Sequence, residues 1–263
     1  IDLQESRAEI IDAGGGFVLP GLVNTHTHLP MTIFRGLADD LPLQTWLHRH
    51  IFPAEAQHIH PETVKLGTLL ACAEMIQSGT TTCCDGYFYE NDIAQTVQIV
   101  GMRAILGQGI IDFPAPGVPE PLKNVTHAIE FIDCWNRSSP LIIPSVFCHT
   151  PYTCSPRTLE TAKQAASDRN LLFQIHAAET KSEWDQFQAE HHTTPIRFLD
   201  RLNLLDQNTL LVHAVWVNDS DIDIIAAHNA TIAHNPESNM KLASGIAPVP
   251  QFLGAGIAVG LGT

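Results

Sequence analysis

Two histidines, His26 and His28, are separated by one threonine and follow directly after an apolar run. In an extended strand, residues two apart point to the same face, so both imidazoles can reach one metal ion. One such pair is weak evidence, because the chain contains 14 histidines. However, His176 and His213 also stand at the ends of apolar runs, and Glu179 follows shortly after His176. Together these residues predict a metal site built from strand ends.

The residue types indicate the chemistry of such a site. Three imidazoles, from His26, His28 and His176, suit Zn²⁺ or another divalent ion that keeps one position open for water. A bound ion of this kind acidifies the water and makes it a nucleophile near neutral pH. Glu179 is placed to move the proton that this reaction requires, with an exposed loop carboxylate as the structural alternative. His213 is either a further ligand or a hydrogen-bond partner of the water, and the sequence leaves both roles open.

Composition and charge limit the classes of protein that fit. The chain has 263 residues, 44% of them hydrophobic, which suits one (β/α)8 barrel of about 250 residues. Its 28 acidic and 14 basic residues give a formal charge of −14, which disfavours a nucleic-acid polymer as partner. No apolar run approaches the ~20 residues of a membrane span, so we expect a soluble protein without a membrane partner. Six cysteines without a C-x-x-C pair indicate reduced thiols in the cytoplasm.

The hydrophobic pattern predicts the elements that position these residues. Short apolar runs alternate with longer amphipathic stretches, which is typical of β-α units closing a parallel barrel. The expected strands are 17–25, 80–87, 103–111, 141–148, 171–175, 209–212, 230–233 and 257–261. The expected helices with clear boundaries are 61–77, 155–169, 195–202, 219–228 and 248–253. The long segment 29–56 is expected to be a loop that forms a lid over the site.

Five motifs carry a resemblance to a known family. They are PGLVNTHTH at 20–28, RGLADDLPL at 35–43, GTTT at 79–82, HAAE at 176–179 and HNPESNMKL at 234–242. In combination they resemble the amidohydrolase superfamily, and within it the 5′-methylthioadenosine/S-adenosylhomocysteine deaminases and related chlorohydrolases. The resemblance implies a (β/α)8 TIM barrel of the amidohydrolase type at 17–263. It also implies that residues 1–16 are the remnant of a small flanking β-sandwich.

The resemblance also implies roles for individual residues. His26, His28 and His176 match the metal ligands, and His213 matches the histidine that holds the metal-bound water. Glu179 matches the carboxylate that contacts the purine ring and shuttles protons.

Three further residues match positions that contact the substrate. These are Trp46, Glu55 and His149. A carboxylate such as Glu55 can accept hydrogen bonds from both vicinal ribose hydroxyls. The structural alternatives are packing of the lid for Trp46 and a carboxylate at the start of a helix for Glu55.

The C-terminal motif departs from the family pattern. Members continue Gly260-Leu261-Gly262-Thr263 into Asp-Gly, and that aspartate is a metal ligand and a base for the water. This sequence stops one residue earlier and begins at Ile1 without a methionine, so we expect that both natural ends, and any targeting segment, lie outside it. Without the aspartate, the span as given is expected to retain metal weakly and to have little activity.

The expected function is hydrolytic deamination of an adenosine-like nucleoside with release of ammonia, a hydrolase reaction at a C–N bond of a cyclic amidine. The leading substrates are 5′-methylthioadenosine and S-adenosylhomocysteine. One divalent metal is expected, with Zn²⁺ preferred to Fe²⁺ or Mn²⁺, and a homo-oligomer is compatible with the sequence. The enzymatic alternative acts on guanine, 8-oxoguanine or an s-triazine. An alternative of another class is a non-catalytic metal-binding barrel, which the missing aspartate motivates.

Overall fold

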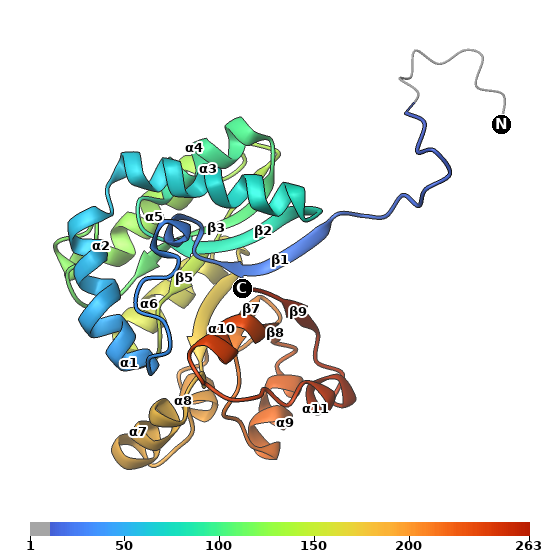
Figure 1. Cartoon of the computed structure of the whole chain (residues 1–263). Coiled ribbons are helices and arrows are strands. Elements are labelled where there is room, and N and C mark those ends of the chain that lie inside the picture. Colours follow the sequence, from blue (N-terminus) through green and yellow to red (C-terminus); the bar gives the residue numbers. More distant parts are fainter. Residues whose placement is uncertain (1–10) are drawn as a thin grey trace.

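The computed structural model describes residues 11–263, which form a parallel barrel with helices between the strands (Figure 1). The strand order is β1-β2-β3-β5-β6-β7-β8-β9, and β4 pairs with β3 ahead of β5. At the closing edge, the Thr263 amide donates to the His26 carbonyl at 2.9 Å. The strands are β1 Leu22–Thr27, β2 Thr80–Tyr87, β3 Arg103–Ile110, β4 Ile142–Pro144, β5 Val146–Cys148, β6 Phe173–Ala177, β7 Thr209–His213, β8 Thr231–His234 and β9 Val259–Leu261. The predicted barrel class is therefore confirmed.

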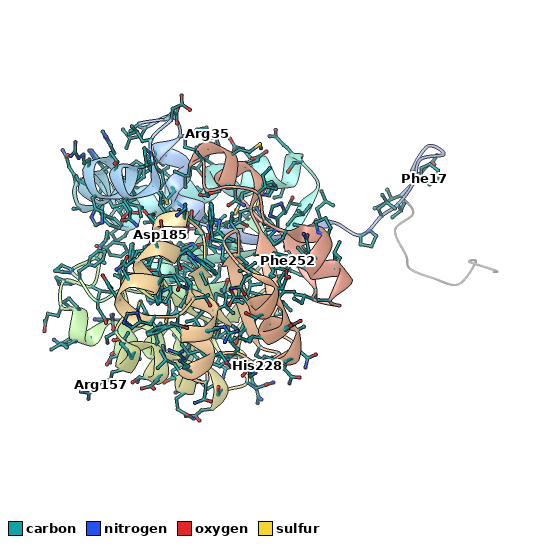
Figure 2. The ribbon with its side chains drawn as sticks, turned by 90° about the horizontal axis from the view of Figure 1, so that it is seen from below. Phe17, Arg35, Arg157, Asp185, His228 and Phe252 are labelled. Carbon is teal, nitrogen blue, oxygen red and sulfur yellow. The ribbon has the colours of Figure 1, made fainter. Side chains whose placement is uncertain are left out.

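The first expected strand was placed too early in the sequence. Residues 17–21 are not in a strand, and β1 begins at Leu22 and continues to Thr27. The Phe17 side chain is 98% exposed on a segment that projects away from the barrel (Figure 2). Its apolar run has no neighbouring strand to pair with among the described residues. Of the expected β-sandwich remnant at 1–16, residues 1–10 lie outside the described part, and 11–16 contain no strand.

The fourth expected strand, 141–148, is divided into β4 and β5. The division falls beside Pro144, which has no N–H to donate to the neighbouring strand. The Ser145 amide still donates to the Leu106 carbonyl of β3 at 2.7 Å, so both pieces follow the same path. The barrel accordingly keeps eight strand positions.

Helices cover the outside of the barrel. They are α3 Pro61–Gln77, α4 Glu90–Val100, α5 Asn124–Trp135, α6 Pro156–Ser167, α7 Lys181–His191, α8 Pro195–Arg201, α9 Asp219–Ala227, α10 Pro236–Lys241 and α11 Val249–Gly254. Helix α3 agrees with its prediction at both ends. Helix α6 begins as predicted, because Ser155 accepts a hydrogen bond from the Thr158 amide and Pro156 occupies the first turn. Within residues 11–263, no helix is both long and apolar enough to cross a membrane.

The segment expected to be a loop, 29–56, is largely helical. It contains η1 Leu29–Phe34, α1 Leu43–Trp46, η2 Leu47–Ile51 and the start of α2 Phe52–His58. Leu43, Leu47 and Ile51 form a small apolar cluster with Leu242, which follows α10. The prediction of a loop was wrong because this burial partner lies far away in the sequence.

All six cysteines are free, and five of them are buried.

Candidate active site

Three histidines converge at the carboxyl ends of the strands. His26 lies near the end of β1, His28 follows that strand, and His176 lies near the end of β6. One ring nitrogen from each lies within 4.8 Å of the others, and His26 Nε2 is 3.1 Å from His176 Nε2. Among the described residues, this is the group of histidine, cysteine and acidic side chains with the geometry to hold a metal ion. His213 does not belong to it.

Backbone carbonyls orient two of these rings. His28 Nδ1 lies 2.7 Å from the Gly86 carbonyl, and His176 Nδ1 lies 2.7 Å from the His149 carbonyl. A carbonyl can only accept a hydrogen bond, so both Nδ1 atoms carry the proton and both Nε2 atoms present lone pairs to the site. Metal-binding histidines are commonly held in this way. The donor set therefore fits a divalent cation.

Burial keeps the histidines of the site neutral. It lowers the pKa of His28 and of His213 to about 4, and it places the pKa values of His26 and His176 well below the ordinary value. Neighbouring imidazoles strengthen the effect for His26 and His176, since each would repel a second positive charge. Near neutral pH, protons consequently compete little with a metal ion for these nitrogens.

A buried carboxyl group on the neighbouring strand, that of Asp85, holds the residues on both sides of His28. Asp85 Oδ1 accepts a hydrogen bond from Thr27 Oγ1 at 2.6 Å and another from the Leu29 amide at 2.7 Å. Its second oxygen, Oδ2, is buried without a hydrogen-bond partner in the described structure. Sequence analysis missed Asp85, although it lies at the carboxyl end of β2 as the histidines do at theirs.

Glu179 and His213 face each other beside the three histidines. His213 Nε2 is 3.7 Å from Glu179 Oε1, and His213 Nδ1 lies 2.9 Å from Asn239 Oδ1. Burial raises the pKa of Glu179 to about 8, so its carboxyl holds a proton near neutral pH in the absence of a nearby cation. Asn239 lies within the motif 234–242, but sequence analysis assigned it no role.

The three predicted substrate-binding residues lie around the same space. Trp46 Nε1 donates to the Leu37 carbonyl at 3.3 Å, and His149 Nδ1 lies 2.9 Å from Thr153 Oγ1. Burial raises the pKa of Glu55 to about 7, and Tyr87 donates a hydrogen bond to its Oε1 at 2.6 Å.

One cavity of about 620 Å³ contains all eight of the predicted site residues in its lining. They are His26, His28, Trp46, Glu55, His149, His176, Glu179 and His213. The rest of the wall is mainly apolar and includes Phe34, Leu43, Phe52 and Phe113. The Phe147 ring supports the histidines, with its centroid 5.3 Å from that of His176. The structure thus combines a polar, metal-competent end with an apolar wall, which suits a small organic ligand.

The comparisons with known proteins agree with this geometry. The model of the amidohydrolase family matches residues 17–263, and the chain belongs to this family. It is 45% identical over 254 residues to a 5-methylthioadenosine/S-adenosylhomocysteine deaminase of Syntrophobacter fumaroxidans, covering 96% of this chain and 57% of the relative. It is 41% identical over 255 residues to a 5′-deoxyadenosine deaminase of Methanothermobacter thermautotrophicus, covering 97% of this chain and 59% of the relative. The chain thus spans somewhat more than half of these relatives' length.

Solved structures show the same likeness. An adenosine deaminase from Xanthomonas campestris with bound zinc has a TM-score of 0.89 and 39% sequence identity, covering 93% of this chain and 55% of that chain. An atrazine chlorohydrolase from Arthrobacter aurescens, complexed with zinc, has a TM-score of 0.85 and 22% identity, covering 93% of this chain and 59% of that chain. At this lower identity, the second likeness concerns the fold alone.

Proposed function

We propose that the enzyme containing this chain hydrolyses adenosine-like nucleosides, replaces the 6-amino group by a carbonyl and releases ammonia. The observation that carries this proposal is the convergence of three neutral histidines beside the buried carboxyl of Glu179 in one largely apolar cavity. The deaminase names of the relatives at 41% and 45% identity support the same reaction. We place the enzyme in the cytoplasm, where free thiols persist, with a small nucleoside as its partner.

His26, His28 and His176 would hold one divalent metal. The ion supplies, when bound, activation of the water molecule that adds to the purine ring. The zinc in the Xanthomonas campestris structure supports Zn²⁺ as the ion, with Fe²⁺ and Mn²⁺ as alternatives. A fourth ligand is expected directly after Thr263, whose amide donates to the His26 carbonyl.

Protons are handled by Glu179 and His213. We assign to Glu179 the transfer of a proton to the ring nitrogen as the water adds, since its carboxyl lies in the cavity and its raised pKa favours the protonated form. The proton on His213 Nδ1 points to Asn239 Oδ1, which leaves His213 Nε2 free to accept a hydrogen bond from the water. A neutral His213 can act in this way because burial keeps its pKa low.

The side chains that line the cavity favour 5′-methylthioadenosine over S-adenosylhomocysteine as the substrate. The arginine and the lysine of the lining are both engaged: Arg35 forms a bidentate pair with Glu74, and Lys241 pairs with Asp39. The amino-acid tail of S-adenosylhomocysteine would need a free cation for its carboxylate, whereas a methylthio group needs apolar contact. We therefore rank 5′-methylthioadenosine first. Glu55 is assigned to the ribose hydroxyls, and Trp46 and His149 to contacts with the nucleoside.

The test is ammonia release from 5′-methylthioadenosine by the full-length, zinc-loaded protein, with Glu179→Gln as the control. We expect release by the wild type and a loss of about 10²- to 10⁴-fold in the variant, the range for a group that transfers a proton. A silent wild-type protein that is folded and metal-loaded would refute this substrate class. Guanine, 8-oxoguanine and s-triazines would then be assayed, and inactivity on all of them would favour the non-catalytic barrel.

A matched pair of substrates tests the role of Glu55. If a free adenine base reacts as fast as its nucleoside, the enzyme does not use the ribose, and the assignment of Glu55 to the vicinal hydroxyls fails.

A further inference from the structure

A second buried carboxylate lies behind Glu179. Glu183, in the first turn of α7, accepts a hydrogen bond from the Ala178 amide at Oε1 and one from the Glu179 amide at Oε2, both at 2.8 Å. Its side chain is almost completely buried, and the cavity lining does not include it. Each carboxylate oxygen thus holds one of two consecutive backbone N–H groups.

The backbone at this point has an unusual conformation. Ala178 has a φ of 53°, in the left-handed region that L-residues adopt at a cost of about 1–3 kcal/mol. Consecutive N–H groups around such a residue point in one direction and form a concave site for an anion. The Ala178 carbonyl is fixed as well, because it accepts hydrogen bonds from the amides of Val215 and Trp216 at 2.9 and 2.8 Å. The peptide is therefore held from both sides.

The Glu179 carboxyl depends on this backbone for its direction. Within residues 11–263 it accepts no hydrogen bond from the protein, and the nearest basic group is His213 Nε2 at 3.7 Å. A side chain without such bonds is aimed by its own backbone and by packing. Any rotation of the peptide between Ala178 and Glu179 would thus move the carboxyl relative to the ligand.

We propose that Glu183 is a positioning residue, which holds the left-handed turn at Ala178 and thereby aims the Glu179 carboxyl at the substrate. This inference rests on the proposed function for its effect on catalysis. Glu183 does not line the cavity, so it acts through Glu179 and not on the substrate. The chemistry requires two acceptor oxygens, one for each N–H. A glutamine offers one acceptor and a donor, and the donor would face an N–H group.

The main experiment uses Glu183→Gln in the full-length, metal-loaded enzyme. We expect kcat for 5′-methylthioadenosine to fall about 10- to 100-fold, as is typical for the loss of a group that orients a reacting residue. KM should stay within about twofold and the metal content should not change, because the lost interaction matters in the transition state. Glu183→Asp keeps the carboxyl group but is one methylene shorter, so we expect it to lose at least one of the two amides and to slow the reaction as well.

Thr194→Ala is the control for loss of stability alone. Thr194 caps α8 by accepting a hydrogen bond from the Arg197 amide, and it does not line the cavity. This variant should lower the Tm while kcat stays at the wild-type value. An unchanged kcat in Glu183→Gln, or a fall that is matched by loss of metal, would overturn the inference.

Hydrogen exchange separates this inference from the proposed function. In Glu183→Gln, the amides of Ala178 and Glu179 should exchange faster, whatever substrate the enzyme uses. Unchanged exchange at both amides would overturn the positioning role even in an active enzyme. Faster exchange in a protein that is silent on every nucleoside would support the structural part of the inference while the proposed function fails.

Discussion

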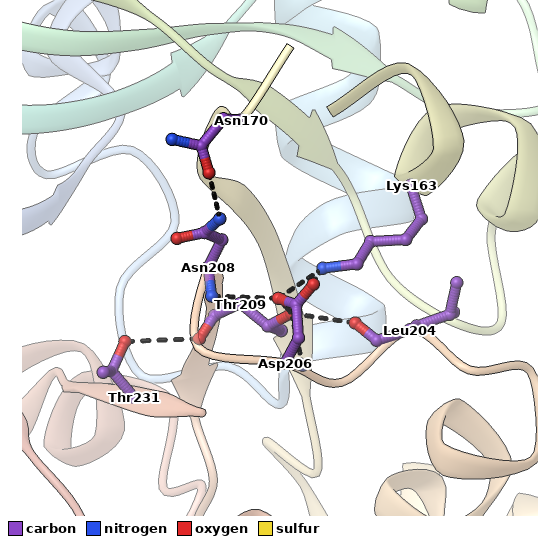
Figure 3. Close-up of polar contacts among 7 residues, drawn as sticks. All are labelled: Lys163, Asn170, Leu204, Asp206, Asn208, Thr209 and Thr231. Carbon is purple, nitrogen blue, oxygen red and sulfur yellow. Dashed lines mark hydrogen bonds and ion pairs between the residues drawn. The ribbon is translucent and has the colours of Figure 1, made fainter. Parts of the chain in front are cut away.

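The two ends of β7 use buried polar groups for opposite purposes. At its amino end, Lys163 donates to Asp206 Oδ1 at 2.7 Å and to Thr209 Oγ1 at 2.9 Å, and Thr209 Oγ1 donates to the Leu204 carbonyl at 2.8 Å (Figure 3). At its carboxyl end, His213 Nε2 has no closer acidic side chain among the described residues than Glu179, at 3.7 Å.

This difference separates the stabilising end of the barrel from the reactive end. Around Thr209 the polar atoms satisfy one another, so burial is compensated within the protein. Around His213, hydrogen-bond acceptors and the carboxyl of Glu179 face a cavity, and burial raises the pKa of that carboxyl. Such uncompensated groups are the ones that a metal ion, water or substrate can complete. Changes at the two ends should therefore affect different measurements.

Removal of the metal should have the largest effect on the reactive end, measured as the rate of deamination. Treatment of the full-length enzyme with a chelator should abolish deamination, because the ion proposed to bind His26, His28 and His176 activates the water. Circular dichroism should still report the folded barrel. Activity should return when zinc is added. Full activity after verified metal removal would contradict the assignment of these histidines.

Substitutions of Asp85 should have the next largest effect. Asp85→Leu removes the acceptor of the Leu29 amide and one of the two acceptors of Thr27 Oγ1. Zinc affinity should therefore fall about 10- to 100-fold, as for other groups that orient metal ligands. Asp85→Asn should bind zinc within about threefold of the wild type, because a single oxygen, Oδ1, accepts both hydrogen bonds.

Competition titrations with a zinc indicator would measure both affinities. Equal losses in the two variants would show that charge, and not the hydrogen bonds to Oδ1, is what matters at Asp85. Glu183 should behave in the opposite way to Asp85, because its two hydrogen bonds use different oxygens.

Lys163→Met tests the stabilising end. It removes two hydrogen bonds, one of them to a carboxylate, so the free energy of unfolding should fall by about 1–3 kcal/mol. The reactive end does not include Lys163, so kcat should not change. Denaturant unfolding and steady-state kinetics of the same preparation would check both statements, and a loss of kcat without a loss of stability would reverse the comparison.

The pH dependence of stability leaves activity aside and concerns the metal-free protein. The folded-state pKa of Glu179, about 8, is above its ordinary value of 4.5, so its contribution to stability is fully present below pH 4.5 and is lost as the pH rises through 8. Glutamine does not titrate. In metal-free protein, the Tm of Glu179→Gln relative to wild type should therefore rise by roughly 10 °C between pH 5 and pH 8, because each unit of the pKa difference corresponds to about 1.4 kcal/mol. A difference independent of pH would mean that the carboxyl is not buried as described.

Several features could be predicted from local sequence because their causes are local. The alternation of short apolar runs with amphipathic stretches predicted β2 and most of the other strands. Proline in the first turn predicted the start of α3, and Ser155 with Pro156 predicted the start of α6. The spacing of His26 and His28 placed both rings on one side of a strand. Strand ends in a parallel barrel meet at one face, so the approach of His176 and His213 followed from the fold class. The structure brings all eight of the predicted site residues to one cavity.

Other features depend on partners that are distant in the sequence. Within residues 11–263, the run at Phe17 has no strand to pair with and is not itself a strand. The segment 29–56 folds into helices because Leu43 and Leu47 pack against Leu242. Asp85 matters because Thr27 and Leu29 lie on the adjacent strand end.

The sequence by itself therefore determined the barrel and the histidines that we propose as metal ligands, since periodicity and strand position are local properties. Only the tertiary structure decided which buried carboxylates hold that site in place, because a hydrogen-bond partner across two strands or behind a turn leaves no periodic signal in the sequence.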